Sequence, residues 1–298
     1  MNRRTFSKLT LAGTLLGTSS RAFAEKDATV PFKANFATTF NQLPTAPKDY
    51  LDQLQFAYDH GFRAWEDNWL KGRDKAMWPK IAEFCKDKKM SLGVSVISAG
   101  HGIDFSQPTE EEMAKLIADL KKGVELAKVT GQTNMTFLPG SRNNLALADQ
   151  ITKSLDTMNR CCDVVEEHGV ILALEPLSHQ IKKKDPLLRS FEDGHMLCKK
   201  LNRKSCKLLA DFYHEGQIGN GDRLIEIAEK VWDQVSYVQY ADSPGRKEPG
   251  TGKLDLDAVT KWLRKKNYKG IIGMEHKAKG KGEEGLKNLI AAYRKIDA

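Results

Sequence analysis

Four polar residues stand at or beside the ends of apolar, β-rich runs in the second half of the sequence: Glu175, Asp211, Gln239 and Glu275. Burying an ionised carboxylate among apolar residues costs free energy unless another group compensates its charge. Carboxylates that converge on one place also repel one another, and a divalent cation removes both costs. All four residues offer oxygen, since glutamine coordinates through its amide carbonyl, and such a set favours Mg²⁺ or Mn²⁺ over structural zinc. We therefore predict a divalent metal site formed by these four residues.

Further side chains that could take part in binding or catalysis lie near the ends of earlier runs. Glu66 ends one run, and His101 follows another. We expect both residues to line the site and to contact the substrate. Trp65 and Trp69 flank Glu66 in the sequence, and their indole rings serve either core packing or stacking on a sugar ring. The sequence leaves both roles of the tryptophans open.

The elements that must bring these residues together alternate regularly along the chain. Strands are expected at 34–40, 62–66, 91–97, 133–138, 170–175, 206–211, 235–240 and 270–275. Helices are expected at 47–59, 74–88, 109–130, 144–168, 188–201, 221–232, 255–266 and 283–296. Nearly continuous apolar strands are typical of parallel strands covered on both faces. Thr109 and Glu112 have the spacing of a capping box at the start of the third helix.

Eight strand–helix units in about 265 residues predict a closed (β/α)8 TIM barrel. The C-terminal ends of all strands meet at one mouth of such a barrel, so the four predicted ligands would converge there. An open doubly wound sheet is the alternative, but no Gly-rich dinucleotide motif follows the first strand. Residues 25–298 contain no Pro/Gly/Ser-rich linker, which indicates one catalytic domain.

Residues 1–24 have the features of an export signal. Arg3 and Arg4 precede a short apolar stretch at 9–16, and Ala22-Phe23-Ala24 has the spacing that signal peptidases accept. The apolar stretch is too short to span a bilayer. We therefore expect a twin-arginine signal, a mature chain that starts near residue 25 in the periplasm or otherwise outside the cytoplasm, and no membrane attachment after cleavage.

Charge and cysteine content narrow the classes of partner. The formal charge of +8 falls to +4 without the four basic residues of segment 1–24 (43 basic minus 39 acidic). Basic runs such as 182–184 then indicate solvated surface, so we expect a small-molecule substrate and no nucleic acid. The five cysteines form no zinc-type Cys-x-x-Cys pair, and a Cys198–Cys206 disulfide is left open. A homodimer is the default expectation for the oligomeric state.

At the predicted ligands the chain resembles the xylose-isomerase-like TIM barrels, and within them the hydroxypyruvate isomerase group. Three segments carry the resemblance: Ala173-Leu174-Glu175-Pro176-Leu177, Ala210-Asp211-Phe212-Tyr213-His214, and the pattern Q-x-A-D-x-P-G-R-x-E-P-G-T-G at 239–252. The resemblance implies that one metal ion is held by Glu175, Asp211, Gln239 and Glu275, with both glutamates close to the substrate.

The same resemblance implies that His214 and Arg246 contact substrate oxygens. The planar guanidinium of Arg246 suits a carboxylate, because it binds both oxygens together. Ser178 is a departure from the pattern, since relatives usually carry asparagine at this position.

The resemblance implies a metal-dependent isomerase that converts hydroxypyruvate to tartronate semialdehyde. One of Glu175 and Glu275 would remove a proton beside the carbonyl, and a cis-enediolate would follow. A ketose 3-epimerase is an alternative, and so is an exported lyase acting on oxidised sugars or glycosides, which a larger and more open mouth would favour. An endonuclease IV-like DNA repair enzyme would need several histidine ligands. A non-catalytic sugar-binding barrel would not need the pair of strand-end glutamates.

Overall fold

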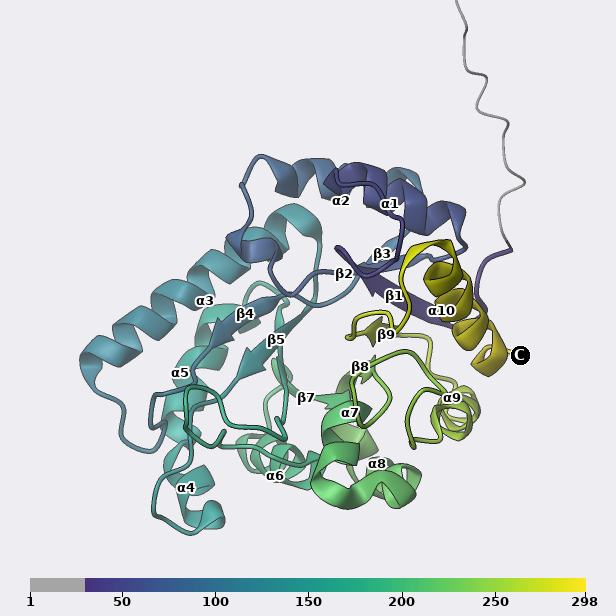
Figure 1. Cartoon of the computed structure of the whole chain (residues 1–298). Coiled ribbons are helices and arrows are strands. Elements are labelled where there is room, and N and C mark those ends of the chain that lie inside the picture. Colours follow the sequence, from purple (N-terminus) through teal and green to yellow (C-terminus); the bar gives the residue numbers. More distant parts are fainter. Residues whose placement is uncertain (1–29) are drawn as a thin grey trace, which may run out of the picture.

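The computed structural model describes residues 30–298, which form a parallel barrel surrounded by helices (Figure 1). The predicted signal at 1–24 lies outside the described residues. Neighbouring strands pair in the order β3-β2-β1-β9-β8-β7-β6-β5-β4, and every pairing is parallel. The strands are β1 (Asn35–Thr39), β2 (Ala64–Glu66), β3 (Ser91–Leu92), β4 (Val96–Ala99), β5 (Asn134–Leu138), β6 (Ile171–Leu174), β7 (Cys206–Asp211), β8 (Val235–Tyr240) and β9 (Ile271–Met274). The predicted TIM barrel is confirmed.

The helices follow the strands along the chain and cover the outside of the barrel (Figure 1). They are α1 (Tyr50–Asp59), α2 (Met77–Asp87), α3 (Glu110–Thr130), α4 (Leu147–Lys153), α5 (Leu155–Glu166), α6 (Phe191–Leu201), α7 (Phe212–Glu215), α8 (Leu224–Val231), α9 (Leu256–Lys265) and α10 (Gly282–Ile296). Shorter helical turns lie at Leu70–Gly72, Gly216–Asn220, Gly221–Arg223 and Trp232–Gln234. No helix of residues 30–298 is long and apolar enough to cross a membrane.

The expected third strand at 91–97 is wrong as a single element, because the structure divides it into β3 and β4. Segment β3 pairs only with β2, whereas β4 pairs only with β5. Gly93 lies at the interruption, and a Cβ atom there would stand 2.2 Å from the Tyr237 hydroxyl. The strand is therefore interrupted at this point, where a tyrosine side chain crosses the barrel interior.

Several expected helices differ from the structure in their bounds, and a hydroxyl hydrogen bond explains two of these differences. The helix expected at 144–168 is divided at Ser154, whose hydroxyl donates to the Gln150 carbonyl at 2.8 Å and competes with regular helical bonding. Helix α6 begins at Phe191 rather than at 188, because the Ser190 hydroxyl caps it by accepting from the Asp193 amide. The capping box of Thr109 and Glu112 is confirmed at the start of α3.

Apolar side chains fill two separate layers. Val94, Ala173, Leu209 and Tyr237 pack together inside the barrel, while the larger cluster lies between the sheet and the helices. Cys198 and Cys206 are buried free thiols, so the disulfide left open by the sequence does not form in this structure. The Cys206 thiol is hydrogen-bonded to the thiols of Cys162 and Cys198, which raises its pKa well above the ordinary value. The three cysteines therefore act as core residues.

Close packing of α3 on β4 depends on Gly123. A Cβ atom there would lie 2.2 Å from Cγ1 of Ile97. Gly123→Ala would gain about 1 kcal/mol of helix propensity but would overpack the core at a cost of about 1–3 kcal/mol. We expect a net loss of about 1 kcal/mol in the free energy of unfolding, measured with urea.

The matched control is Gly72→Ala, because nothing lies within 4 Å of a Cβ atom at Gly72. Ile97→Ala should leave a cavity, and its combination with Gly123→Ala should cost less than the sum of the two single changes. Additive losses would contradict the close contact.

Candidate functional site

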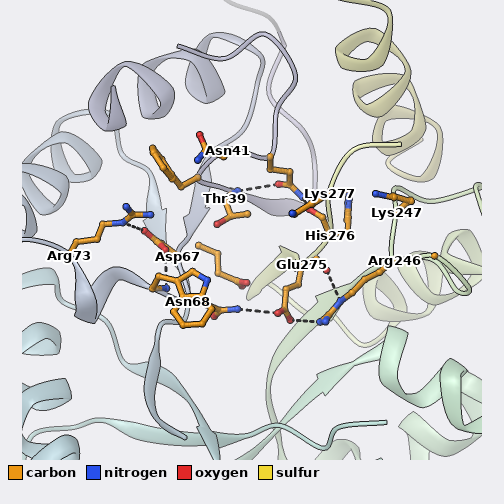
Figure 2. Close-up of a pocket in the computed structure, with 15 residues that line it drawn as sticks. Thr39, Asn41, Asp67, Asn68, Arg73, Arg246, Lys247, Glu275, His276 and Lys277 are labelled. Carbon is orange, nitrogen blue, oxygen red and sulfur yellow. Dashed lines mark hydrogen bonds and ion pairs between the residues drawn. The ribbon is translucent and has the colours of Figure 1, made fainter. Parts of the chain in front are cut away.

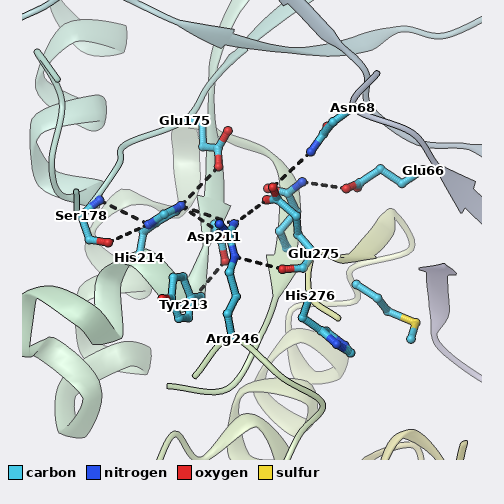
Figure 3. Close-up of polar contacts among 12 residues, drawn as sticks. Glu66, Asn68, Glu175, Ser178, Asp211, Tyr213, His214, Arg246, Glu275 and His276 are labelled. Atoms are coloured by element: carbon cyan, nitrogen blue, oxygen red, sulfur yellow. Dashed lines mark hydrogen bonds and ion pairs between the residues drawn. The ribbon is translucent and has the colours of Figure 1, made fainter. Parts of the chain in front are cut away.

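The four predicted ligands lie at the C-terminal ends of adjacent strands (Figure 3). Asp211 ends β7 and pairs in register with Gln239 of β8, while Glu175 and Glu275 directly follow β6 and β9. Asp211 and Gln239 are fully buried, and about a quarter of the Glu275 side chain is exposed (24 %). We refer to Glu175, Asp211, Gln239 and Glu275 as the acidic cup. Their convergence follows from the parallel barrel itself.

Arg246 enters the acidic cup from the loop after β8. Its Nη2 atom lies 3.1 Å from Asp211 Oδ2 and 2.9 Å from Glu275 Oε2. Its Nε donates to the Glu275 carbonyl at 3.0 Å, and the guanidinium lies 4.8 Å from the centre of the Tyr213 ring. Burial alone would lower the pKa of Arg246, but the surrounding carboxylates raise it. The guanidinium is therefore a permanent positive charge beside the carboxylates.

His214 stands on the other side of Arg246 and is held as a neutral donor. The backbone N–H of Ser178 donates to His214 Nδ1 at 3.2 Å, so Nδ1 accepts and the proton of the neutral ring lies on Nε2. That Nε2 faces Glu175 Oε1 at 3.6 Å and Asp211 Oδ2 at 3.5 Å. Burial, followed by the charge of Arg246, lowers the pKa of His214 well below its ordinary value. The imidazole can thus donate a hydrogen bond without carrying a charge.

Glu66 lines the cavity described below, as expected, and it also holds Gln239 in place. Its carboxylate accepts from the Tyr237 hydroxyl and from the Gln239 amide nitrogen, both at 2.8 Å. Gly273 makes room for it, since a Cβ atom there would lie 2.0 Å from Glu66 Oε2. Because the Gln239 nitrogen points to Glu66, its buried carbonyl oxygen is left without a hydrogen-bond partner. Both Glu66 oxygens thus accept a hydrogen bond, and the residue orients Gln239. Its contact with substrate stays a prediction.

Burial raises the pKa of Glu66 and of the three carboxylic acids in the acidic cup. The pKa of Glu66 rises to about 8 and that of Glu275 to about 7, in each case mainly through burial. The pKa of Glu175 rises well above its ordinary value through burial and the neighbouring Glu275, and burial also raises that of Asp211. Arg246 compensates only part of this negative charge.

The acidic cup fits a divalent cation. Ligand atoms of Glu175, Asp211 and His214 lie within 4.8 Å of one another, a grouping that includes His214 in addition to two of the predicted ligands. The unpartnered oxygen of Gln239 is one more donor of the kind that Mg²⁺ and Mn²⁺ prefer. Glu275 is turned toward Arg246 and Asn68, whose amide donates to Glu275 Oε1 at 3.2 Å.

A cavity of about 590 Å³ opens beside the acidic cup (Figure 2). Glu275 and Arg246 line one part of it, and Asn41, Trp69, Arg73 and Lys277 line others. His101 does not line this cavity; it lines a narrow space beside Glu175 and Leu138. Ser178 and Tyr237 have functional positions that the sequence did not reveal, because neither ends a strand and each acts through a neighbour.

Comparison with known proteins agrees with this fold. Residues 54–296 match the family model described as the xylose isomerase-like TIM barrel. Hydroxypyruvate isomerase of Escherichia coli is 24 % identical over 268 residues, which cover 86 % of this chain and 96 % of that protein.

Two solved structures share the fold at low identity. A 3-keto-D-glucoside 4-epimerase from E. coli has a TM-score of 0.69 at 18 % identity, covering 89 % of this chain and 99 % of the other. The IOLI protein, solved with a bound zinc atom, has a TM-score of 0.60 at 20 % identity, covering 82 % and 89 %.

The raised carboxyl pKa values predict how the stability of the metal-free protein depends on pH. Each raised carboxyl binds its proton more tightly when folded, so stability falls as the pH rises from about 4.5 to about 8. Burial lowers the pKa of His276 to about 3, which acts in the opposite sense, but its effect is complete above about pH 6.5. From pH 6.5 to 8 the free energy of unfolding in chelator should fall by about 2 kcal/mol through Glu66 alone.

Urea denaturation at both pH values measures this change, and Glu66→Gln should reduce it. Added Mn²⁺ should restore stability at pH 8. Stability that is constant or rises over this range in chelator would contradict the description of the acidic cup.

Proposed function

The chain belongs to the xylose isomerase-like TIM barrel family, and from this membership and the acidic cup we propose an isomerase of the hydroxypyruvate isomerase type. The observation that carries the proposal is the pair Glu175 and Glu275, whose carboxyls both have raised pKa values at one barrel mouth. A carboxyl whose pKa is raised above its ordinary value can accept a proton and later return it. The named relatives are isomerases and epimerases, which supports the same class of reaction.

The proposed substrate has a carbonyl beside a hydroxyl-bearing carbon, as hydroxypyruvate does. We propose that the site holds a divalent ion, Mg²⁺ or Mn²⁺. When bound, this ion would act as a Lewis acid and polarise the substrate oxygens. Glu175, Asp211, Gln239 and Glu275 would hold it, and the Nε2–H of His214 lies beside Glu175 and Asp211. The zinc in one similar barrel supports a metal site without identifying the ion used here.

One of Glu175 and Glu275 removes the proton from the hydroxyl-bearing carbon, and the electron pair left behind forms the second bond of a cis-enediolate. His214 donates its Nε2 proton in a hydrogen bond to a substrate oxygen, and Arg246 binds a carboxylate or a developing negative charge. Return of the proton to the neighbouring carbon, with transfer of the hydroxyl proton to the former carbonyl oxygen, gives the isomer. Return to the opposite face of the same carbon gives the 3-epimerase alternative.

The cavity favours one other alternative. A lyase on oxidised sugars or glycosides would use the same proton abstraction and then expel a leaving group, and a wide mouth suits such substrates. A DNA repair enzyme with several zinc ions has less support, because residues 30–298 contain only one close group of three potential ligands. We also propose, from the leader at 1–24, that the protein works outside the cytoplasm, and cell fractionation tests this.

Deuterium exchange tests the proposed proton transfer. The Mn²⁺-loaded protein in D₂O should introduce deuterium beside the carbonyl of hydroxypyruvate or of a ketose. Proton NMR, recorded after the reaction is quenched and the paramagnetic ion removed, measures the loss of that proton signal. Glu175→Gln and Glu275→Gln should each slow this uptake by about 10²–10⁴-fold, since each removes an acid–base group. Glu226→Gln, on the exposed face of α8, is the control and should leave uptake unchanged. Near-normal uptake in both cup variants would refute the mechanism.

A further inference from the structure

The cavity beside the acidic cup is larger than a three-carbon acid requires. A molecule of that size fills about three or four water volumes of roughly 30 Å³ each. The cavity measures about 590 Å³, within the range of roughly 300–1,000 Å³ that holds drug-sized ligands. Most of it would therefore stay filled with water if hydroxypyruvate were the only ligand.

An exposed tryptophan, Trp69, lines this cavity. Trp69 is 78 % exposed, and it is the only aromatic residue among the large exposed hydrophobic residues in the described part of the chain. An exposed indole ring that lines a cavity offers a flat apolar face to a ligand. Such a face complements the C–H surface of a pyranose ring, whose hydroxyl groups point outward and need polar partners.

Asp67 forms hydrogen bonds with the residues around Trp69. Asp67 accepts from the Trp69 amide at 2.9 Å, from the Tyr50 hydroxyl at 2.8 Å and from Arg73 Nε at 2.5 Å. The Arg73 guanidinium stacks 4.4 Å from the centre of the Phe40 ring and 4.6 Å from that of Tyr50. One buried carboxylate thus fixes both Trp69 and Arg73.

The same arrangement leaves hydrogen-bonding groups free on the cavity wall. Neither terminal nitrogen of Arg73 makes a hydrogen bond within residues 30–298, although the side chain lines the cavity. Asn41 and Lys277 line it as well, and Figure 2 shows Arg73 and Lys277 on opposite sides of the space. An aromatic platform with several polar groups around it is suited to a sugar ring more than to a purely apolar group.

We propose that Trp69 and Arg73 form a second subsite, which binds a pyranose ring attached to the reacting hydroxy-carbonyl unit. The substrate class is then a glycoside-sized keto sugar: its carbonyl end lies at Glu275 and Arg246, and its second ring stacks on Trp69. This proposal rests on the proposed function for the identity of the reacting end. It extends that function by assigning the rest of the cavity to substrate recognition.

Binding of matched sugars tests the subsite. D-fructose provides the reacting unit alone, and lactulose, maltulose and isomaltulose carry the same ketose with a second pyranose ring. For the Mn²⁺-loaded protein, isothermal titration calorimetry should give at least one of these disaccharides a Kd about tenfold below that of fructose, which corresponds to about 1.4 kcal/mol of stacking. Trp69→Ala should abolish this preference without weakening fructose binding, whereas Trp69→Phe should keep most of it.

Equal Kd values for fructose and all three disaccharides, no binding of any disaccharide, or a preference that survives Trp69→Ala would overturn the proposal. The proposal would also fail if Trp69→Ala changed the oligomeric state alone. This outcome would appear as a shift in size-exclusion chromatography without a change in sugar binding, and Trp69 would then be a subunit contact. Deuterium uptake measured on the same samples separates the two proposals. Trp69-dependent disaccharide binding without uptake from any sugar would remove the isomerase and retain the subsite.

Discussion

Four carboxylic acids buried at one end of the barrel, with one guanidinium among them, form the constraint on which the rest of the site depends. Glu66, Glu175, Asp211 and Glu275 carry more potential negative charge than Arg246 compensates. Protonation or a bound cation must supply the remainder. The surrounding residues are arranged around this excess charge. Glu66 binds the Gln239 amide nitrogen and leaves the Gln239 oxygen without a partner, and Ser178 fixes the proton of neutral His214 on Nε2.

The alternation of apolar strands and amphipathic helices was sufficient to predict the barrel, and the strand ends were sufficient to predict the acidic cup. Both follow from local patterns, since parallel strands buried on both faces must place their polar residues at the ends. The division of segment 91–97 was not predictable, because it depends on Tyr237, which reaches across the barrel from a distant strand. The supporting role of Glu66 was missed for the same reason, since its partners Tyr237 and Gln239 lie about 170 positions away in the sequence.

In our proposal the site combines proton transfer at one end with substrate recognition at the other. The acidic cup, with His214 and Arg246, would carry out the proton transfer next to a carbonyl. Trp69 and Arg73, which line the wide cavity, belong to the loop after β2, where Asp67 accepts from the Trp69 backbone and from the Arg73 side chain. A barrel can alter such loops without disturbing its strands, so substrate size and reaction type are set by different segments.

Metal binding to the purified protein tests the central claim most directly. After treatment with chelator and its removal, titration with Mn²⁺ followed by electron paramagnetic resonance should reveal one tightly bound ion per chain. Asp211→Asn should weaken that binding by at least about tenfold, because it removes a fully buried ligand charge. If the intact protein bound no divalent ion, or if Asp211→Asn bound it equally well, the acidic cup would not be a metal site and the proposed chemistry would be wrong.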